Sequence, residues 1–325
     1  MPATAFTDQT SPASETPRRA IAQRAPQRTD RPFRGIVLVI ASTVFLACSD
    51  ALSKYLTRSL PPVEITWIRF LVYVLIMLSV IAMRTGGHAL RTRRPGIQVL
   101  RGLGLTGSAL FFIWGLRYLP IAEASATAFI APVFVTGLSV ILLAEKVGIR
   151  RWIATIVGLL GVLIVMRPGS GAFHLAAFFP IASALCWAFA LILTREISGT
   201  DHPVTTMAYS AIVGFVVLSV MAPFFWVTPT LEQVGIALLI GIFSTAGHWI
   251  VVLAYRHADA SVLAPFTYSQ LLWVSILGFV MFMEIPDRWT ILGAGIIICS
   301  GLYIAERERI RKGQMRDASK DTSGA

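Results

Sequence analysis

Three ionisable residues stand inside long apolar segments of this 325-residue chain: Asp50, Arg69 and His248. A charge at the centre of a lipid bilayer costs roughly 2.5–3.5 kcal/mol on insertion scales, so such residues pair with each other or face a water-filled cavity. A carboxylate and a guanidinium can bind a polar solute, and a histidine can hydrogen-bond a solute or carry a coupling proton near neutral pH. The structural alternatives are an ion pair that fixes two helices and a histidine bonded to a neighbouring helix.

Asp50 and Arg69 are expected at similar depths. Asp50 lies about six residues, or about 9 Å, from the end of its segment, and Arg69 is similarly placed in the next segment. Two antiparallel helices joined by a short loop would hold these side chains at the same depth in the membrane. We therefore expect Asp50 and Arg69 to pair or to face one outward-opening cavity. Lys54, one helical turn from Asp50, is a further candidate partner at i, i+4.

Aromatic and amide side chains form a second group of candidate substrate-binding residues. Tryptophans near the ends of membrane segments usually anchor the chain at the interface, but three lie deeper. Aromatic faces for stacking and polar groups for hydrogen bonding would suit a flat, amphipathic heterocycle, while packing towards lipid is the alternative for each ring. The candidates in this group are Trp187, Trp249, Trp273, Tyr268, Thr245 and Gln270.

Two prolines stand inside apolar segments, Pro132 and Pro265. Each removes a backbone hydrogen bond and frees a carbonyl, which in lipid must be satisfied by protein or water. We therefore predict a helix kink that lines a cavity at both positions.

The composition predicts the elements that carry these residues. Apolar residues make up 55% of the chain and charged residues 14%. Crossing a bilayer takes about 20 mostly apolar residues per helix, and alternation typical of a β-barrel is missing. We predict an all-α polytopic membrane protein with ten transmembrane helices, at about 35–56, 63–83, 98–117, 121–144, 150–167, 174–195, 203–226, 233–254, 259–284 and 288–305.

The ten segments divide into two similar sets of five. Ser42, Lys54 and Pro62 in the first half correspond to Ser183, Arg195 and Pro203 in the second, and Glu145 corresponds to Glu284. Because five is odd, the second copy would enter the membrane from the opposite side, as in many secondary transporters. We predict inverted five-helix repeats over 35–168 and 174–305, a disordered tail over 1–34 and a basic tail over 306–325.

Residues shared by both repeats are expected to serve the common architecture. Lys54 and Arg195 are interpreted as anchors that extend towards the membrane surface. Glu145 and Glu284, at the ends of segments, are interpreted as structural, through a helix-terminal hydrogen bond or an ion pair with Arg150 or Arg151. Polar residues present in only one repeat, such as Asp50, are the expected substrate ligands.

The net charge of +11 is explained by topology and not by nucleic-acid binding. Most Lys and Arg residues lie in the tails and the even-numbered loops, which places both termini in the cytoplasm. We expect a multi-pass protein of the cell inner membrane. The three cysteines have no metal-ligand spacing, and neither a metal nor a cofactor is expected.

Two stretches carry a recurring pattern of small residues, Pro and Glu. The first has Leu119-Pro120, Ala122 to Ser125, Pro132, Glu145, Gly158 and Gly161, and the second has Ala258 to Ser261, Pro265, Glu284, Pro286, Gly293, Gly295 and Gly301. The pattern resembles the EamA branch of the drug/metabolite transporter superfamily over residues 35–305. The resemblance implies two inverted repeats around a central cavity, and solute exchange by alternating access.

The resemblance leaves the solute open, since members move amino acids, vitamins, nucleotide-type metabolites and drugs, inward or outward. Ala264 to Phe266, Tyr268 to Gln270 and Gly301 to Tyr303 are most similar to a group that includes riboflavin uptake carriers. We therefore expect a secondary transporter of a small organic metabolite, with riboflavin or a similar aromatic heterocycle as the first candidate. Export of an amino acid, drug or metabolite is the alternative.

Other classes of function are less well supported. An intramembrane enzyme would need a catalytic constellation, and no HExxH motif, carboxylate cluster or phosphate-binding loop is present. A channel would need a filter or a ring of like charges. The expected partners are the solute, the lipid bilayer and a coupling proton. Small residues such as Gly104 and Ser108 suggest close helix packing and leave open a homodimer.

Overall fold

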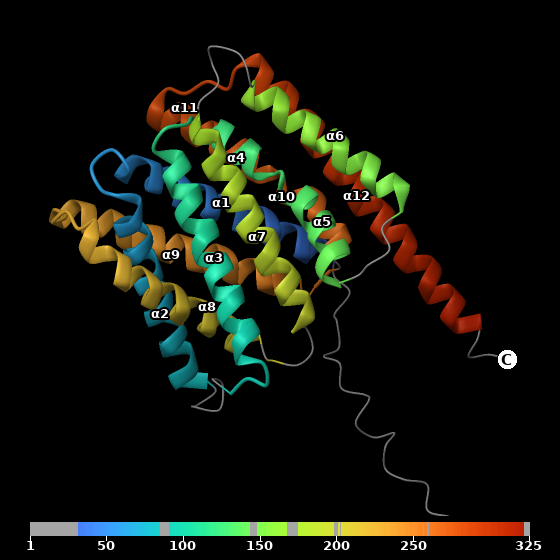
Figure 1. The fold of residues 1–325 in the computed structure, drawn as a ribbon, viewed down its shortest axis with the longest axis horizontal. Coiled ribbons are helices and arrows are strands. Elements are labelled where there is room, and N and C mark those ends of the chain that lie inside the picture. The colour runs from blue at the N-terminus through green and yellow to red at the C-terminus, as the bar shows by residue number, and fades with distance from the viewer. Residues whose placement is uncertain are drawn as a thin grey trace, which may run out of the picture.

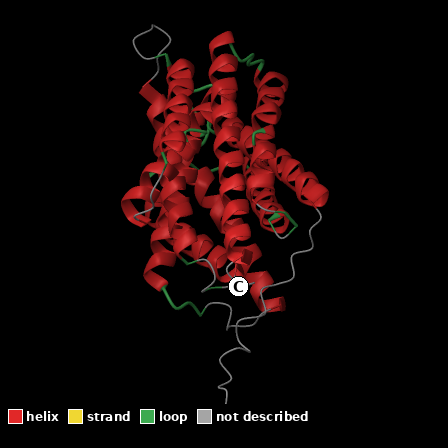
Figure 2. Ribbon diagram, turned by 90° about the vertical axis from the view of Figure 1, so that its right-hand side faces the viewer, coloured by secondary structure: helices red, strands yellow, loops and turns green. Residues whose placement is uncertain are grey.

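The computed structural model of the protein describes residues 32–84, 91–143, 148–167, 175–197, 201, 203–255, 257–258 and 260–321. Residues 1–31, which make up nearly all of the expected N-terminal tail, and Glu145 lie outside the described residues. Every regular element in the described part is a helix (Figures 1 and 2). The α-helices are α1 (Pro32–Leu56), α2 (Pro62–Arg84), α3 (Pro95–Leu116), α4 (Ile121–Ala128), α5 (Ala131–Leu143), α6 (Ile149–Met166), α7 (Phe178–Glu196), α8 (Pro203–Met221), α9 (Leu231–Ala254), α10 (Ala260–Thr267), α11 (Ser269–Phe282) and α12 (Arg288–Asp321).

The helices account for the ten apolar segments expected from the sequence. Eight helical stretches of the described chain are long and apolar enough to cross a membrane, and one of them combines α4 with α5. Shorter apolar stretches, Trp152–Met166 in α6 and Arg288–Tyr303 in α12, account for the other two segments. The expectation of an all-helical, multi-pass membrane protein is confirmed. The segment 306–325, expected to be a tail, continues α12 as helix through Asp321.

Local sequence explains where several helices begin. Proline is the first residue of α1, α2, α3 and α8, where its missing N–H removes no intrahelical hydrogen bond and its fixed φ suits the helix. Before α9, the Thr230 side chain accepts from the Gln233 backbone N–H while the Gln233 side chain accepts from the Thr230 backbone N–H. This reciprocal pair is a capping box, which satisfies two amides at the helix start.

The fourth and ninth segments are each broken near the predicted prolines. α4 ends at Ala128 and α5 begins at Ala131, so Pro132 is the second residue of the new helix, a position that tolerates proline. In the ninth segment, α10 contains Pro265 and ends at Thr267, and α11 begins at Ser269. Both segments are therefore interrupted close to the prolines, while the kink predicted at Pro132 and Pro265 themselves stays a prediction.

Each of the main helix contacts joins one half of the chain to the other. The pairs are α1 with α9, α2 with α8, α3 with α7 and α6 with α12, and Figure 1 shows α6 lying along α12 at one edge of the molecule. Small residues allow close approach: a Cβ on Gly161 would lie 2.9 Å from the Gly293 carbonyl oxygen. Gly104 packs against α7 in the same way, and Ser108 bonds to α7 (below), so these two predicted packing residues serve a contact within the chain.

Large apolar side chains cover the outer surface of the bundle. On α6, Ile153, Ile156 and Leu160 are each more than half exposed. A soluble protein rarely shows so large an apolar surface, whereas the hydrocarbon of a bilayer solvates it. The polar side chains that are buried inside the bundle consequently determine where a solute could bind.

Candidate functional site

A cavity of about 300 Å³ lies within the bundle, at the lower end of the range for small-molecule sites. Helices of both halves line it: α1, α2, α3, α4 and α5 from the first, and α7, α8, α9 and α11 from the second. Residues at the two helix interruptions reach it, including Phe129 and Gln270. Six of the nine predicted substrate-binding residues are among its lining residues: Asp50, Arg69, Trp187, Thr245, His248 and Gln270.

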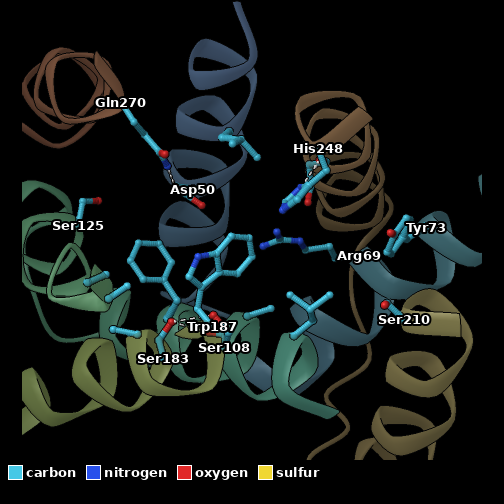
Figure 3. A pocket seen from close by; sticks show the side chains of 18 of the residues that line it. Asp50, Arg69, Tyr73, Ser108, Ser125, Ser183, Trp187, Ser210, His248 and Gln270 are labelled. Atoms are coloured by element: carbon cyan, nitrogen blue, oxygen red, sulfur yellow. Dashed lines mark hydrogen bonds between the residues drawn. The ribbon is translucent and has the colours of Figure 1, made fainter. Parts of the chain in front are cut away.

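Asp50, on α1, contributes a carboxylate to the cavity. Its side chain is 93% buried, since its relative exposure is 7%. One oxygen, Oδ2, accepts a hydrogen bond from Nε2 of Gln270 at 3.0 Å, and Figure 3 shows the two side chains pointing towards each other across the gap between α1 and α11. The predicted contact with Lys54 is not made, because Lys54 pairs elsewhere.

Arg69, on α2, extends its guanidinium into the same cavity (Figure 3). Within the described residues, this guanidinium forms neither a hydrogen bond nor an ion pair. Both Asp50 and Arg69 face one cavity, and no ion pair within 4 Å joins them in the described structure; that the cavity opens outward stays a prediction. A guanidinium presents five N–H donors, so the partly buried Arg69 can receive an acceptor-rich group of a solute.

His248, on α9, is oriented by its own helix. Its Nδ1 lies 2.8 Å from the Ser244 carbonyl oxygen. A carbonyl can only accept, so Nδ1 carries the proton and Nε2 of the neutral ring is an acceptor. Figure 3 shows the imidazole on the side of the cavity from which the Arg69 guanidinium also projects. The predicted contact with a neighbouring helix is replaced by a bond within α9, which leaves Nε2 available to the cavity.

An aromatic wall forms the opposite side of the cavity. Trp187, on α7, is 39% exposed, and Phe112 and Phe129 also line the cavity. The indole of Trp187 lies 6.4 Å from the His248 ring, centroid to centroid. A serine pair fixes α7 against α3 beneath the indole: Ser183 Oγ donates to the Ser108 carbonyl at 2.8 Å. The wall thus offers a flat apolar face with polar edges.

The other three predicted ligands lie outside the cavity. Trp249 packs with apolar residues of α2 and α8. Tyr268 stacks on Phe129, with ring centroids 5.1 Å apart, and its hydroxyl approaches Gly301 so closely that a Cβ there would collide with it. Trp273 packs in the main apolar cluster, and its buried N–H has no acceptor in the described part of the chain. These three rings therefore pack against apolar residues of the bundle, which is neither the predicted contact with solute nor the alternative of packing towards lipid.

The structure adds polar residues that the sequence reasoning passed over. Tyr73, Ser108, Ser125, Ser183 and Ser210 line the cavity. Ser183 corresponds to Ser42, and residues shared by both repeats are expected to serve the common architecture. That rule fails here because equivalent positions of the two halves can face one central space. The correspondence itself was the usable signal: Arg69 corresponds to Ser210, and Leu46 to Trp187, and all four line the cavity.

Arg101 is another partly buried cation, close to Ser210 of the cavity lining. Its Nε donates to Thr194 Oγ1 at 2.7 Å, and Nη1 donates to the Thr206 carbonyl at 3.1 Å and to Ser210. Arg101 therefore joins α3 to α7 and α8. Unlike Arg69, its donors are already used by the protein, so we assign it a structural role.

Lys54 corrects the prediction of a surface anchor. It is 8% exposed and turns inward, where Nζ lies 2.7 Å from Glu284 Oε1 and 2.5 Å from the Leu119 carbonyl. The other Glu284 oxygen accepts from the N–H of Ile121, the first residue of α4, at 3.0 Å, which is the helix-terminal bond expected of this glutamate. The pairing neutralises the charge inside the protein and removes the need for Lys54 to reach the surface. We call this end of the bundle the Lys54 end.

Comparison with known proteins assigns this architecture to a family. The profile described as the EamA-like transporter family matches residues 33–167 and again residues 174–305. The chain belongs to this family. The two matches of the EamA-like family coincide with the two halves whose helices surround the cavity, and the family is one of transporters and not of enzymes.

Named relatives of this EamA-like chain transport different solutes. A protein from Rickettsia bellii named S-adenosylmethionine uptake transporter is 30% identical over 275 residues, covering 85% of this chain and 94% of the relative. A riboflavin transporter from Vibrio cholerae is 27% identical over 281 residues, covering 85% and 94%. A pseudopaline exporter from Pseudomonas aeruginosa is 27% identical over 279 residues, covering 85% and 97%. These similarities establish a small-molecule transporter.

A solved crystal structure shares the fold. It superposes with a TM-score of 0.60, at 18% identity, over 84% of this chain and 98% of the other. Within the described residues, no group of three His, Cys, Asp or Glu side chains is arranged to hold a metal ion. The groups that line the cavity can provide ion pairing, hydrogen bonding and stacking.

Proposed function

We propose that this protein is a secondary transporter that takes up a flat, aromatic metabolite across the bacterial inner membrane by alternating access. The observation that carries the proposal is the central cavity, which helices of both halves line and which combines Trp187 with Asp50 and Arg69. The sequence argument placed riboflavin first. S-adenosylmethionine, which the name of a Rickettsia relative adds, has a flat ring as well. Both solutes are therefore candidates.

The proposal includes two inverted five-helix repeats. The helix contacts support it, because they are consistent with exchange of the two halves. If α1 corresponds to α7 and α3 to α9, the pair α1 with α9 becomes α7 with α3, and both pairs are present. The pairs α2 with α8 and α6 with α12 join corresponding helices directly. Opposite orientation in the membrane follows from the odd number of segments in each half, with both termini in the cytoplasm.

Alternating access requires that contacts at each end of the bundle break in turn. At the Lys54 end, α4 packs against α11, and the Lys54–Glu284 pair crosses between α1 and the end of α11. We infer that this end is closed in the structure and that opening it separates Lys54 from Glu284. An ion pair with one partly exposed member, Glu284 at 27%, suits such a contact because water can solvate the carboxylate when the pair opens.

A proton is the proposed coupling ion, with His248 as its carrier. Arg69, Asp50 and Tyr73 are the other titratable groups of the cavity. In liposomes, an inward proton gradient should accelerate uptake by the wild type and leave His248→Ala unaffected. Equal acceleration of both proteins would remove His248 from this role.

Counterflow in proteoliposomes tests the transport function itself. The full-length protein is reconstituted, liposomes are loaded with unlabelled S-adenosylmethionine or riboflavin, and entry of the same labelled solute is measured. A carrier should give saturable entry that the solute inside accelerates, and protein-free liposomes should give neither. Entry that does not saturate would indicate a channel. Failure of correctly folded protein to exchange either solute would overturn the proposed substrate pair.

A further inference from the structure

The central cavity presents two opposite charges that the protein does not pair with each other. Asp50 projects into it from α1 and Arg69 from α2. Gln270 occupies one oxygen of Asp50, and its Oδ1 has no hydrogen-bond partner among the described residues. The Arg69 guanidinium forms no hydrogen bond and no ion pair within 4 Å in the described part of the chain. The cavity therefore offers an unused donor group and an unused acceptor at once.

Burying charges without partners has a physical cost. An ionisable residue at mid-depth in a membrane needs a counter-ion, a carbonyl or water. If stability alone determined the arrangement, the two groups would form an ion pair, as Lys54 and Glu284 do in the same structure at 2.7 Å. Keeping them apart is useful when a solute supplies the counter-charges, because solute binding then gains the interactions that the empty cavity lacks.

The surroundings favour one kind of solute. A guanidinium binds a carboxylate through two parallel hydrogen bonds, which is the geometry that arginine suits best. A single carboxylate oxygen suits an ammonium or another compact cation. Trp187, 39% exposed on the same cavity, stacks on a flat ring and also attracts a cation over its face. Nε2 of His248 and the cavity hydroxyls can accept or donate along the edge of such a ring.

We propose that the cavity recognises a zwitterion, an amino-acid-like head whose carboxylate pairs with Arg69 and whose cationic group pairs with Asp50, attached to a flat ring that lies on Trp187. This proposal rests on the proposed transport function and narrows its substrate class. It favours S-adenosylmethionine, which carries both charges, over riboflavin, which is uncharged at neutral pH. A merely anionic solute would leave Asp50 unpaired, and a merely cationic solute would leave Arg69 unpaired.

Matched solutes that differ by one charge test the proposal. The purified full-length protein is incubated with S-adenosylmethionine or tryptophan, and with the corresponding decarboxylated compounds, decarboxylated S-adenosylmethionine and tryptamine. Binding is measured from ligand-dependent thermal stabilisation and from competition in counterflow. We expect at least one zwitterion to bind, and removal of its carboxylate to weaken binding at least 10-fold. Indole-3-propionate, which keeps the carboxylate and lacks the ammonium, should also bind less tightly than tryptophan.

The variants assign each charge of the solute to one residue. Arg69→Gln should bind a zwitterion and its decarboxylated form about equally, and Asp50→Asn should no longer distinguish tryptophan from indole-3-propionate. Arg58→Gln, which changes an exposed arginine outside the cavity, serves as the matched control and should retain the wild-type discrimination. If Arg69→Gln or Asp50→Asn does not fold, Arg69→Lys and Asp50→Glu keep the charge and should still distinguish the solutes, with lower affinity.

The outcomes separate this proposal from the transport function. Exchange of riboflavin by a protein that binds neither zwitterion would overturn the zwitterion and leave the carrier standing. Equal binding of zwitterions and decarboxylated forms by the wild type would also overturn recognition of a zwitterion and leave the transport function untouched. Absence of binding and exchange for every solute, in folded protein, would refute both proposals.

Discussion

The substitution Glu284→Gln removes the negative charge that faces the buried ammonium of Lys54. Breaking a buried ion pair by removing one partner costs about 3–5 kcal/mol, because the remaining charge is uncompensated. The Glu284 side chain is 27% exposed, so water screens part of this cost, and we expect about 2–3 kcal/mol. The glutamine carbonyl can still accept from the Ile121 N–H, which keeps the bond at the start of α4.

Thermal unfolding in detergent micelles, followed by tryptophan fluorescence, measures the effect. For a chain of this size, about 2 °C of Tm corresponds to 1 kcal/mol, so Glu284→Gln should lower Tm by about 4–6 °C. The double variant Lys54→Met with Glu284→Gln should be less destabilised than the sum of the two single variants, by about 1–3 kcal/mol, because neither charge is then left alone.

Glu196→Gln is the matched control. It breaks the Arg94–Glu196 pair, whose side chains are 47% and 40% exposed, and exposed pairs contribute at most about 1 kcal/mol. Its Tm should change by no more than about 2 °C. If both glutamine variants shift Tm equally, or if the Lys54 and Glu284 effects simply add, the inward ion pair does not stabilise the protein as argued.

Three further predictions follow from particular contacts. Gly301→Ala should markedly lower Tm or yield because its Cβ would collide with Tyr268. Adding Tyr268→Ala should restore much of the loss. If Gly301→Ala has no effect, the contact between α12 and Tyr268 is not as tight as argued. Burial alone would raise the pKa of Asp201, but hydrogen bonds from Thr92, Gln98 and the Arg93 backbone outweigh it and lower the pKa. The ionised Asp201 carboxylate therefore stabilises the fold at neutral pH, and this stabilisation disappears as pH falls below about 4. The Tm difference between wild type and Asp201→Asn should accordingly shrink from pH 7 to pH 3, and a constant difference would contradict it. Trp187→Ala should raise the KM for solute at least 10-fold, because stacking contributes about 1 kcal/mol beyond the buried area. Trp226→Ala, outside the cavity, should change the KM less than about two-fold. Equal effects of the two substitutions would argue against the aromatic wall.

The sequence predicted the helices because their signal is local. About 20 consecutive apolar residues suffice to identify a membrane-spanning helix. Kinks at Pro132 and Pro265 are predicted for the same reason, since a missing N–H removes a helix hydrogen bond, and the helices are interrupted close to both residues. Asp50, Arg69 and His248 were identified because the cost of a charge in lipid does not depend on the neighbouring helices.

The tertiary structure decided which way each side chain points. These helices are apolar on nearly all sides, so no hydrophobic face in the sequence indicates their rotation about their own axes. Trp187 and Trp273 are therefore alike in sequence, yet contacts with other helices turn Trp187 into the cavity and Trp273 into the apolar cluster. Lys54 turns inward because Glu284, 230 positions away in the chain, and the Leu119 carbonyl are brought to it by folding. The types of interacting groups are fixed by the sequence, and their partners are fixed by long-range packing.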